Sequence, residues 1–253
     1  MPADQIALAP FYLDWKFWAV AVSVVALILS QLPPIHILLR RAKLDVEAYS
    51  RMHLTHKVGN PNAQLHLIIS NGGGKELKIK SIALRLRRGT EDEFVLPAQN
   101  YLQSPGDKEA VLLTSFRLKP KEEWAHIVNF LNFFSRQDEK HYRQLEANLR
   151  QDILVKRDAL VNKNIDVTAD DENVQPLIKF FESKFRWLPG EYELTLQVQV
   201  EPERASLSKR YRITLFESDS KELTDYRDDY KYGFGVCLDS QRHVGVIVPL
   251  TEA

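Results

Sequence analysis

Two carboxylate-x-x-His pairs, Glu123/His126 and Asp138/His141, have the spacing that comes closest to a metal site in this chain. Side chains at i and i+3 share a helix face, and di-iron bundles combine two Glu-x-x-His motifs with further glutamates from four helices. This region has fewer helical segments than such a bundle needs. Glu123 also lies in the opening turn of the first segment, where acidic residues favour a helix N-terminus. We therefore interpret both pairs as surface residues.

Three histidines, a glycine-rich segment and one cysteine are the other positions with chemical potential. His53, His56 and His66 could meet on a sheet face and bind zinc, although no acidic residue stands where it would support them. The segment SNGGGKE (70–76) lacks the spacing of a phosphate-binding loop and predicts a turn. Cys237 is predicted to be a small buried hydrophobe on a strand. The sequence thus predicts no catalytic residue, no metal ligand, no cofactor and no small-molecule substrate, so the chain is not expected to be an enzyme.

Basic and tyrosine side chains are instead expected to contact other molecules. The residues predicted to contact a membrane surface or a partner are Arg40, Arg41, Lys43, Lys78, Lys80, Arg85 and Arg87. Each basic residue near an anionic bilayer contributes about 1 kcal/mol. Tyr226, Tyr230 and Tyr232 form a possible protein-contact surface. The chain has 34 basic and 34 acidic residues, and no aromatic residues alternate with the basic ones, so we expect no nucleic-acid partner.

The hydrophobic pattern divides the chain after residue 40 into strands, helices and strands. Apolar and polar residues alternate with the period of a strand up to about residue 118 and again after residue 188. The parity of this alternation changes near Ser81, which predicts either a β-bulge or two separate strands. Residues 120–186 have apolar residues at helical spacing, so we predict about three helices there. The first of these would carry Trp124, Ile127, Val128 and Leu131 on one face.

An uncharged stretch of 23 residues, Phe17–Leu39, predicts a retained transmembrane helix. As a helix it would span roughly 34 Å, close to the hydrocarbon thickness of a bilayer. Its first part lacks the polar stripe of a helix that packs on a soluble core. The preceding residues include two aspartates and no small-x-small cleavage site follows, which argues against a cleaved signal peptide. Pro33 and Pro34 either kink this helix or end it.

The charges that flank the predicted span indicate its orientation. Three basic residues follow the span closely, whereas two aspartates and a single lysine precede it. Positive residues are retained on the cytoplasmic side of a membrane. We therefore expect a single-pass protein with its N-terminus outside and residues 40–253 in the cytoplasm.

The segment LPGEYELTLQV, around Pro189–Val198, resembles a late strand of immunoglobulin-like and fibronectin-like sandwiches, where a Pro-Gly turn precedes a tyrosine on an alternating strand. The resemblance implies a sandwich but no activity. We expect a mainly β fold with a helical insert. Its parts would be a short N-terminal segment (1–16), the transmembrane helix (17–39) and an immunoglobulin-like antiparallel β-sandwich (40–253) interrupted at about 120–186.

The expected function is that of a non-catalytic, membrane-anchored scaffold, adaptor or accessory subunit of a membrane-associated complex. Its partners would be membrane lipid and either an unidentified protein or further copies of the chain in a homo-oligomer. The alternative is a membrane effector or sensor that acts through oligomerisation of its transmembrane helix. In that case the polar residues Ser23, Ser30, Gln31 and His36 would link neighbouring helices.

Overall fold

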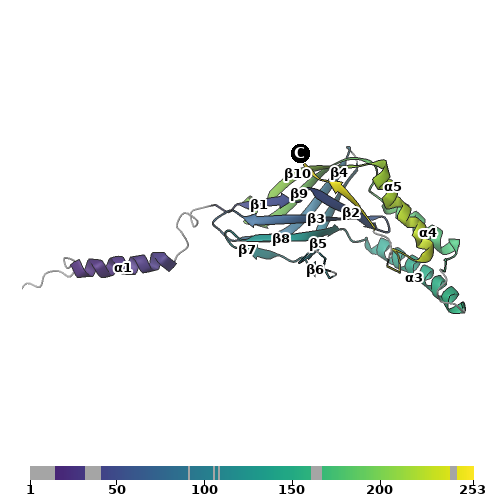
Figure 1. Cartoon of the computed structure of the whole chain (residues 1–253), viewed down its shortest axis with the longest axis horizontal. Coiled ribbons are helices and arrows are strands. Elements are labelled where there is room, and N and C mark those ends of the chain that lie inside the picture. The colour runs from purple at the N-terminus through teal and green to yellow at the C-terminus, as the bar shows by residue number, and fades with distance from the viewer. Residues whose placement is uncertain are drawn as a thin grey trace, which may run out of the picture.

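A nearly closed antiparallel sheet forms the body of the chain, and helices cover one end of it (Figure 1). The structure, a computed structural model, describes residues 15–31, 41–90, 92–104, 106–107, 109–160, 167–239 and 244–253. The helices are α1 (Trp15–Gln31), α3 (Arg136–Ala159), α4 (Asp171–Lys184), α5 (Glu217–Asp225) and the 3-10 segments η2 (Glu203–Ala205) and η3 (Tyr226–Tyr232). The prediction of a mainly β fold with helical insertions is confirmed.

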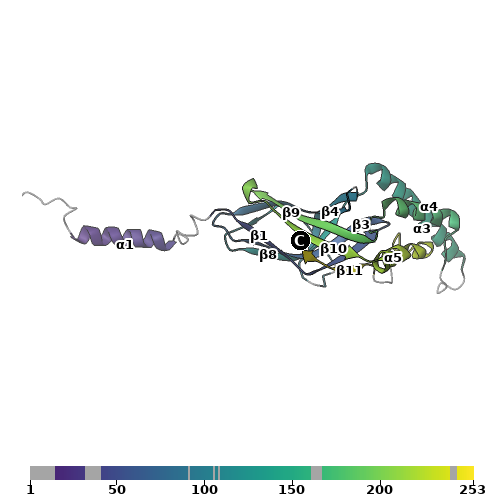
Figure 2. The ribbon, with the colours of Figure 1, turned by 90° about the horizontal axis from the view of Figure 1, so that it is seen from above.

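The sheet has twelve strands in the order β11-β2-β3-β8-β5-β4-β9-β10-β12, with β1, β6 and β7 paired to β3, β5 and β4. The first six strands are β1 (Leu44–Ala48), β2 (Arg51–Lys57), β3 (Asn60–Asn71), β4 (Leu77–Arg88), β5 (Asp92–Leu102) and β6 (Val111–Leu112). The others are β7 (Phe116–Leu118), β8 (Glu123–Leu131), β9 (Gly190–Glu201), β10 (Leu207–Leu215), β11 (Val246–Pro249) and β12 (Thr251–Glu252). Figure 2 shows β9 and β10 side by side along the body.

Two segments that change partners along their length join the two halves of the sheet. Residues 92–97 of β5 pair with β4, and its remaining residues pair with β8 after a register shift between Ala98 and Asn100. Near the C-terminus, β11 pairs with β2 whereas β12 pairs with β10. Between them, the Leu250 N–H donates to the Ser50 carbonyl at 2.8 Å. Partner changes of this kind fold a sheet over its core and leave few unpaired edges.

Alternation along the strands fills the interior of the sheet with leucine, isoleucine and valine. The inward residues of three long strands are Leu65, Leu67 and Ile69 of β3, Ile82, Leu84 and Leu86 of β4, and Leu194, Leu196 and Val198 of β9, and all are buried. Where β4 pairs with β9, the register shifts between Ile79 and Ser81. The predicted β-bulge near Ser81 is therefore confirmed, and β4 is one strand.

The prediction of a helix at the start of the 120–186 region is wrong, because β8 occupies Glu123–Leu131. β8 lies between β3 and β5 near the middle of the sheet. Trp124 and Val128 are four residues apart, a spacing that suits a helix face and also the same face of a strand. Trp124, His126, Val128 and Phe130 in fact follow the two-residue period, with Val128 and Phe130 buried in the sheet core. Among the described residues of the helical insert there are therefore two helices, α3 and α4, instead of about three.

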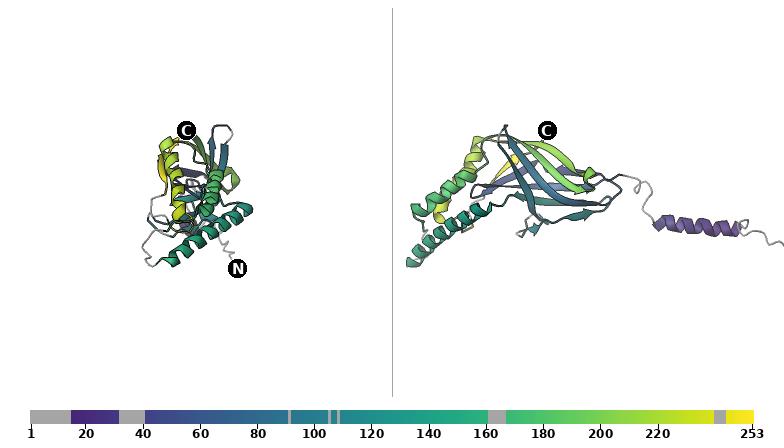
Figure 3. Two further views of the ribbon diagram at one scale, coloured as in Figure 1. Left: turned by 90° about the vertical axis from the view of Figure 1, so that its right-hand side faces the viewer. Right: turned by 180° about the vertical axis from the view of Figure 1, so that it is seen from behind.

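A second, smaller core lies among the helices at one end of the body (Figure 3). α3 contributes Tyr142, Leu145, Leu149 and Ile153, and α4 contributes Val174, Leu177, Phe180 and Phe181. Apolar residues at this helical spacing are the reason why helices are predicted within residues 120–186. The Ser135 hydroxyl caps α3 by accepting from the Asp138 N–H at 3.1 Å. Tyr230 of η3 completes this core, so the helical region combines the insert with residues from beyond β10.

The turn between β2 and β3 connects the sheet to this helical core. Val58 and Gly59 both have positive φ, 46° and 84°, as in the mirror-image turns that favour hairpins. Val58 is a β-branched residue, for which this conformation is strained, yet its side chain is 1% exposed and lies in the helical core. A Cβ on Gly59 would lie 2.4 Å from the backbone oxygen of Phe181 in α4. The hairpin tip therefore meets α4 at close backbone contact.

His56, near the same turn, is hydrogen-bonded through both ring nitrogens. Its Nε2 lies 2.8 Å from the Leu223 carbonyl of α5, and its Nδ1 lies 3.2 Å from the Gly59 nitrogen. A carbonyl can only accept and an amide N–H can only donate, so the ring is neutral with its proton on Nε2. The rings of Phe181 and Phe185 lie 5.1 and 5.9 Å away, centroid to centroid. Burial lowers the pKa of His56 below its ordinary value.

The Pro-Gly segment before β9 forms a corner that is held by buried aromatic residues. The Tyr192 hydroxyl donates to the Leu188 carbonyl at 2.7 Å, with the Arg186 carbonyl 2.9 Å away. Its burial raises the pKa of Tyr192 to about 12. The Trp187 indole N–H donates to the backbone carbonyl of Thr55 in β2 at 2.7 Å. A tyrosine that bonds back to the preceding backbone also occurs at a corner of immunoglobulin-like domains.

Helix α1 lies apart from the sheet, and its apolar side chains are exposed (Figure 1). The exposed residues include Trp15, Trp18, Val20, Val22, Val24, Val25, Leu27, Ile28 and Leu29. No helix among the residues described here has both the length and the apolar character needed to cross a bilayer. Residues 32–39 of the predicted span, including Pro33 and Pro34, lie outside the described residues.

We expect Gly59→Ala to destabilise the protein much more than Gly89→Ala. Both glycines have positive φ, which costs an L-residue about 1–2 kcal/mol. A Cβ on Gly89 meets nothing within 4 Å, whereas one on Gly59 would overlap the backbone of Phe181. The additional overpacking should bring the total for Gly59→Ala to about 2–5 kcal/mol. Urea unfolding of the full chain measures the free energy of unfolding of each variant. Equal losses of stability in the two variants would show that the hairpin tip does not press on α4.

We also expect the stability of the protein to fall as the pH drops below about 6.5, the ordinary pKa of histidine. Because the pKa of His56 is lowered in the folded state, the unfolded chain takes up a proton first, so stability is highest above that pH and declines below it. Protonation of Nδ1 would also break the bond from the Gly59 N–H. Urea midpoints between pH 5 and 8 should show a smaller decline in His56→Gln than in the wild type. Identical pH dependence would contradict the assignment to His56.

Candidate functional site

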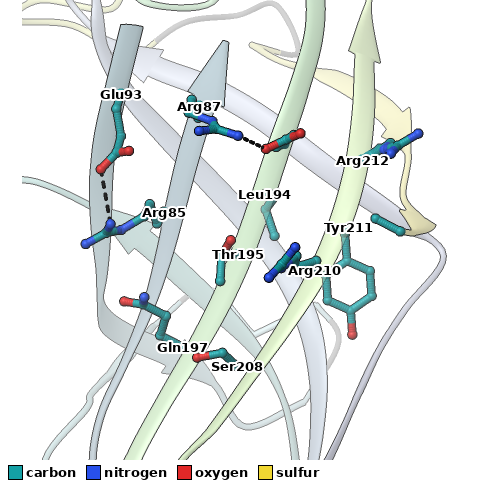
Figure 4. A pocket seen from close by; sticks show the side chains of 12 residues that line it. Arg85, Arg87, Glu93, Leu194, Thr195, Gln197, Ser208, Arg210, Tyr211 and Arg212 are labelled. Carbon is teal, nitrogen blue, oxygen red and sulfur yellow. Dashed lines mark hydrogen bonds and ion pairs between the residues drawn. The ribbon is translucent and has the colours of Figure 1, made fainter. Parts of the chain in front are cut away.

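The outward face of β4, β9 and β10 carries basic and acidic side chains, among them the predicted contact residues Arg85 and Arg87 (Figure 4). On β4, Lys80, Arg85 and Arg87 are exposed and Lys78 is half-buried, while Ile79, Ile82, Leu84 and Leu86 fill the core. This outward orientation agrees with the sequence-based prediction. Alternation in β9 and β10 places further polar residues beside them.

Carboxylates from neighbouring strands pair with most of these basic residues. Lys80 lies 3.3 Å from Glu201, and Arg85 lies 3.4 Å from Glu93. Arg87 forms a hydrogen-bonded ion pair with Glu193. All of these pairs are largely exposed, so each contributes little to stability. The surface is therefore a mosaic of both charges, in contrast to the uniformly basic strand that the sequence of β4 indicates.

The predicted basic surface is also divided along the length of the body. The chain enters the body near the Arg41 carbonyl, which accepts from Gly74 at 3.4 Å, at the end where β4 begins. Arg41 and Lys43 are exposed there, and Arg40 lies outside the described residues. Arg85 is seven residues beyond Lys78, which corresponds to roughly 23 Å along a strand. Arg85 and Arg87 therefore form a site that is separate from Arg41 and Lys43, the basic residues where the chain enters the body.

Two successive rows of side chains cross the three strands at this separate site. In the first row, Glu193 of β9 is the register partner of both Arg87 of β4 and Arg212 of β10. In the second row, Thr195 of β9 is the register partner of both Arg85 and Arg210. Each row thus has an arginine on either side of the central strand. The alternation of apolar and polar residues in β10 indicates that Arg210 and Arg212 point outward. Only the strand order shows that they lie across β9 from Arg85 and Arg87.

The electrostatics of the first row are those of a carboxylate between two guanidinium groups. The hydrogen bond and the charge of Arg87 hold the pKa of Glu193 below its usual range, and the charges of Arg212 and Arg210 act in the same direction. In the second row, a threonine hydroxyl takes the central place. An open depression of about 510 Å³ lies over both rows, and Gln197 and Ser208 line it beyond Thr195 (Figure 4). Arginine pairs of this kind bind anions through charge-assisted hydrogen bonds.

The three tyrosines that were predicted to contact a partner are largely internal. Tyr226 is 8% exposed and Tyr230 is 2% exposed, so neither presents a surface to another protein. The Tyr226 hydroxyl oxygen accepts from the Gly245 N–H at 3.1 Å. Tyr232 is half-buried, and Lys231 lies over its ring at 5.1 Å. The segment folds into η3, which packs Tyr226 against the sheet core and Tyr230 into the helical core. The prediction is therefore wrong for these two residues and stays a prediction for Tyr232.

The structure keeps the candidate metal ligands apart. Glu123 and His126 lie on β8, where residues three apart point to opposite faces. Asp138 forms an ion pair with Lys184 at 2.7 Å, and His141 is near Phe180. His56 points into the interior, whereas His53 and His66 lie on the outward faces of β2 and β3. Within the described ranges, no group of three or more His, Cys, Asp or Glu side chains could hold a metal ion.

Cys237 lies in a turn that follows η3, and its place on a predicted strand is wrong. Its Sγ is 3.7 Å from the Gly233 carbonyl. Burial raises the pKa of the thiol, which keeps it protonated at neutral pH. A protonated thiol is a weak nucleophile. The arrangement therefore agrees with a structural role for this residue.

An aromatic cluster near the end of the sheet where the chain enters is not predicted, because helical spacing assigns two of its members, Trp124 and His126, to a helix. The rings of Trp124 and Phe116 stack at 4.9 Å, and Tyr101 lies 4.7 Å from His126. A depression of about 310 Å³ opens beside them. The alternation of Trp124 and His126 with exposed or half-buried neighbours is the signal that could have revealed this face.

Comparison with known proteins adds no relative whose function could guide the interpretation. No protein-family model matches the chain, and no curated protein shows significant sequence similarity to it.

Proposed function

We propose that the chain is a membrane-anchored, non-catalytic scaffold or adaptor that holds its helical end away from a bilayer. The observation that carries this proposal is the exposure of apolar side chains around α1. Val22, Leu27 and Ile28 point in different directions around the helix, and each is more than half exposed, at 64, 65 and 54%. An apolar surface of this kind requires a lipid or protein environment. The sequence continues the uncharged stretch to Leu39, which is the length of a bilayer span.

The body provides a spacer between this anchor and the helices. The chain enters the body beside Gly73, where a Cβ would lie 2.5 Å from the Arg41 carbonyl. The Val58–Gly59 turn at the other end of β3 meets α4. The twelve residues of β3 span roughly 40 Å, so the helices lie about that far from the entry point. A nearly closed sheet is suited to this role because its strands support one another on both sides.

The orientation in the membrane is proposed from the charges next to the anchor. Arg40, Arg41 and Lys43 follow the predicted span, and retention of positive charge places them in the cytoplasm. The sheet and its helices would then be cytoplasmic. The partner would be a protein that binds the body, or further copies of the chain.

A role in which the span itself oligomerises has weaker support. Such helices use polar side chains as contacts with their neighbours. The Ser23 hydroxyl instead donates to the Ala19 carbonyl at 2.8 Å, and the Ser30 hydroxyl donates to the Leu27 carbonyl at 2.7 Å. Both donors are satisfied within α1 and need no partner helix. His36 lies outside the described residues.

Charged substitutions in α1 should release the protein from membranes. Lysine at the centre of a span costs about 2.5–3.5 kcal/mol, so Val24→Lys combined with Leu27→Lys should cost about 5–7 kcal/mol of insertion. The matched control is Leu154→Lys with Val155→Lys, because these residues are similarly exposed on α3, at 44 and 57%. Alkaline carbonate extraction should leave the wild type and the control in the pellet and move the α1 variant to the supernatant. Extraction of the wild type would refute the anchor.

Reporter fusions can test the orientation separately. A reporter that is active only outside the cytoplasm, fused after Ala253, should be silent, while one that is active only in the cytoplasm should give signal. Exchanging Arg40, Arg41 and Lys43 for glutamine should reduce this asymmetry, because the flanking charge bias is then removed. Activity of the external reporter in the wild type would reverse the assignment.

A further inference from the structure

The two arginine rows on the outward face differ in one central residue. Each row consists of register partners on β4, β9 and β10, with strands about 4.8 Å apart, so the two arginine Cα atoms of a row are roughly 9.6 Å apart. Glu193 occupies the centre of one row and Thr195 the centre of the other. Because Glu193 and Thr195 are two residues apart on one strand, their side chains point to the same face. The first row therefore has a carboxylate between its two arginines, and the second row has a hydroxyl in that position.

The carboxylate of Glu193 neutralises its own row from within the chain. It accepts from Arg87 and lies next to Arg212, and the charges of both lower its pKa. Thr195 offers only a hydroxyl to Arg85 and Arg210. Arg85 is paired at its side with Glu93, and Figure 4 draws no interaction from Arg210 to the other residues shown. Among the described residues, Thr195 and no carboxylate stands at the centre of the second row, although the charge of Arg210 also acts on Glu193 in the first row.

We propose that the row Arg85–Thr195–Arg210 binds a phosphate group, which takes the place that the Glu193 carboxylate holds in the neighbouring row. Two guanidinium groups would approach the phosphate from opposite sides. The Thr195 and Ser208 hydroxyls and the Gln197 amide lie in the same depression and can donate further hydrogen bonds. A tetrahedral anion with several acceptor oxygens suits donors from three sides better than a planar carboxylate does.

The phosphate has two possible sources with the same chemistry. One is a soluble phosphorylated compound or free phosphate, and the other is the phosphomonoester headgroup of a lipid in the adjoining membrane. The site itself does not depend on the proposed anchor, because it is built entirely from strands of the body. Binding of a lipid would require the outward face of β9 to tip onto the bilayer.

The test replaces Thr195 with a residue that fills the site from within. Thr195→Glu makes the second row identical in kind to the first, so its carboxylate should occupy the position of the phosphate. The matched control is Gln199→Glu, which adds the same charge on the same face of β9, beside Ser81 instead of arginine. Isothermal titration of inorganic phosphate into the full chain, held in phosphatidylcholine nanodiscs, measures the affinity of each.

We expect the wild type to bind one phosphate at millimolar or lower concentration. Thr195→Glu should weaken binding about tenfold or more, and Gln199→Glu should change it by less than about twofold because solvent and salt screen the added charge. Arg210→Gln should also weaken binding, which provides a second variant that leaves the core untouched. Absence of saturable binding by the wild type, or an equal loss in Thr195→Glu and Gln199→Glu, would overturn the proposal.

A second arm distinguishes the two sources of phosphate. Phosphatidic acid added to the nanodiscs should compete with soluble phosphate if a lipid headgroup reaches the site. Phosphatidylserine at the same charge density controls for general attraction to an anionic surface. Competition by phosphatidic acid alone identifies the lipid, and no competition by either lipid identifies a soluble phosphate. Equal competition by both lipids would show attraction of charge without a phosphate site and would overturn the proposal.

Discussion

The contact between the β2–β3 turn and α4 is the constraint on which the rest of the structure depends. It brings Val58 from the sheet into the helical core, and it leaves no space for a side chain at Gly59 beneath Phe181. His56 fixes the same junction by bonding α5 and the turn at once. A strained conformation at Val58 persists because the surrounding burial and hydrogen bonds determine it from several sides. The junction makes the sheet and the helices one body.

Because the sheet is nearly closed, the body forms a spacer with two distinct ends, and the junction with the helices lies at one of them. β5 and the β11–β12 segment each pair with both halves, so the sheet folds over one core of alternating apolar residues. The chain enters the body at one end, beside Gly73, and the helices lie at the other end (Figure 1). The same alternation directs every second residue of β4, β9 and β10 outward. Core formation and the charged outer face are therefore two consequences of one periodicity.

The register between strands gives the outer face its chemical detail. A shift of one residue in the β9–β10 pairing would exchange the inward and outward faces, so the hydrophobic core fixes which arginines face which central residue. In the register observed, Glu193 balances one arginine pair and Thr195 leaves the next pair open. A membrane-anchored scaffold with an anion site on its side would combine attachment at one end with recognition along the body.

The sequence by itself determined most of the strands and two helices of the insert, because hydrophobic periodicity is local. It also showed a change of parity near Ser81 but left a bulge and two strands open, and the pairing of β4 with β9 decided for the bulge. Only the tertiary structure decided that 123–131 is a strand, since the spacing of Trp124 and Val128 fits both periods and the pairing with β3 and β5 selects one. It likewise decided that Tyr230 is buried and that Arg210 faces Arg85. Those outcomes depend on which segments become neighbours, and contacts between residues far apart in the chain leave no periodic signal in the sequence.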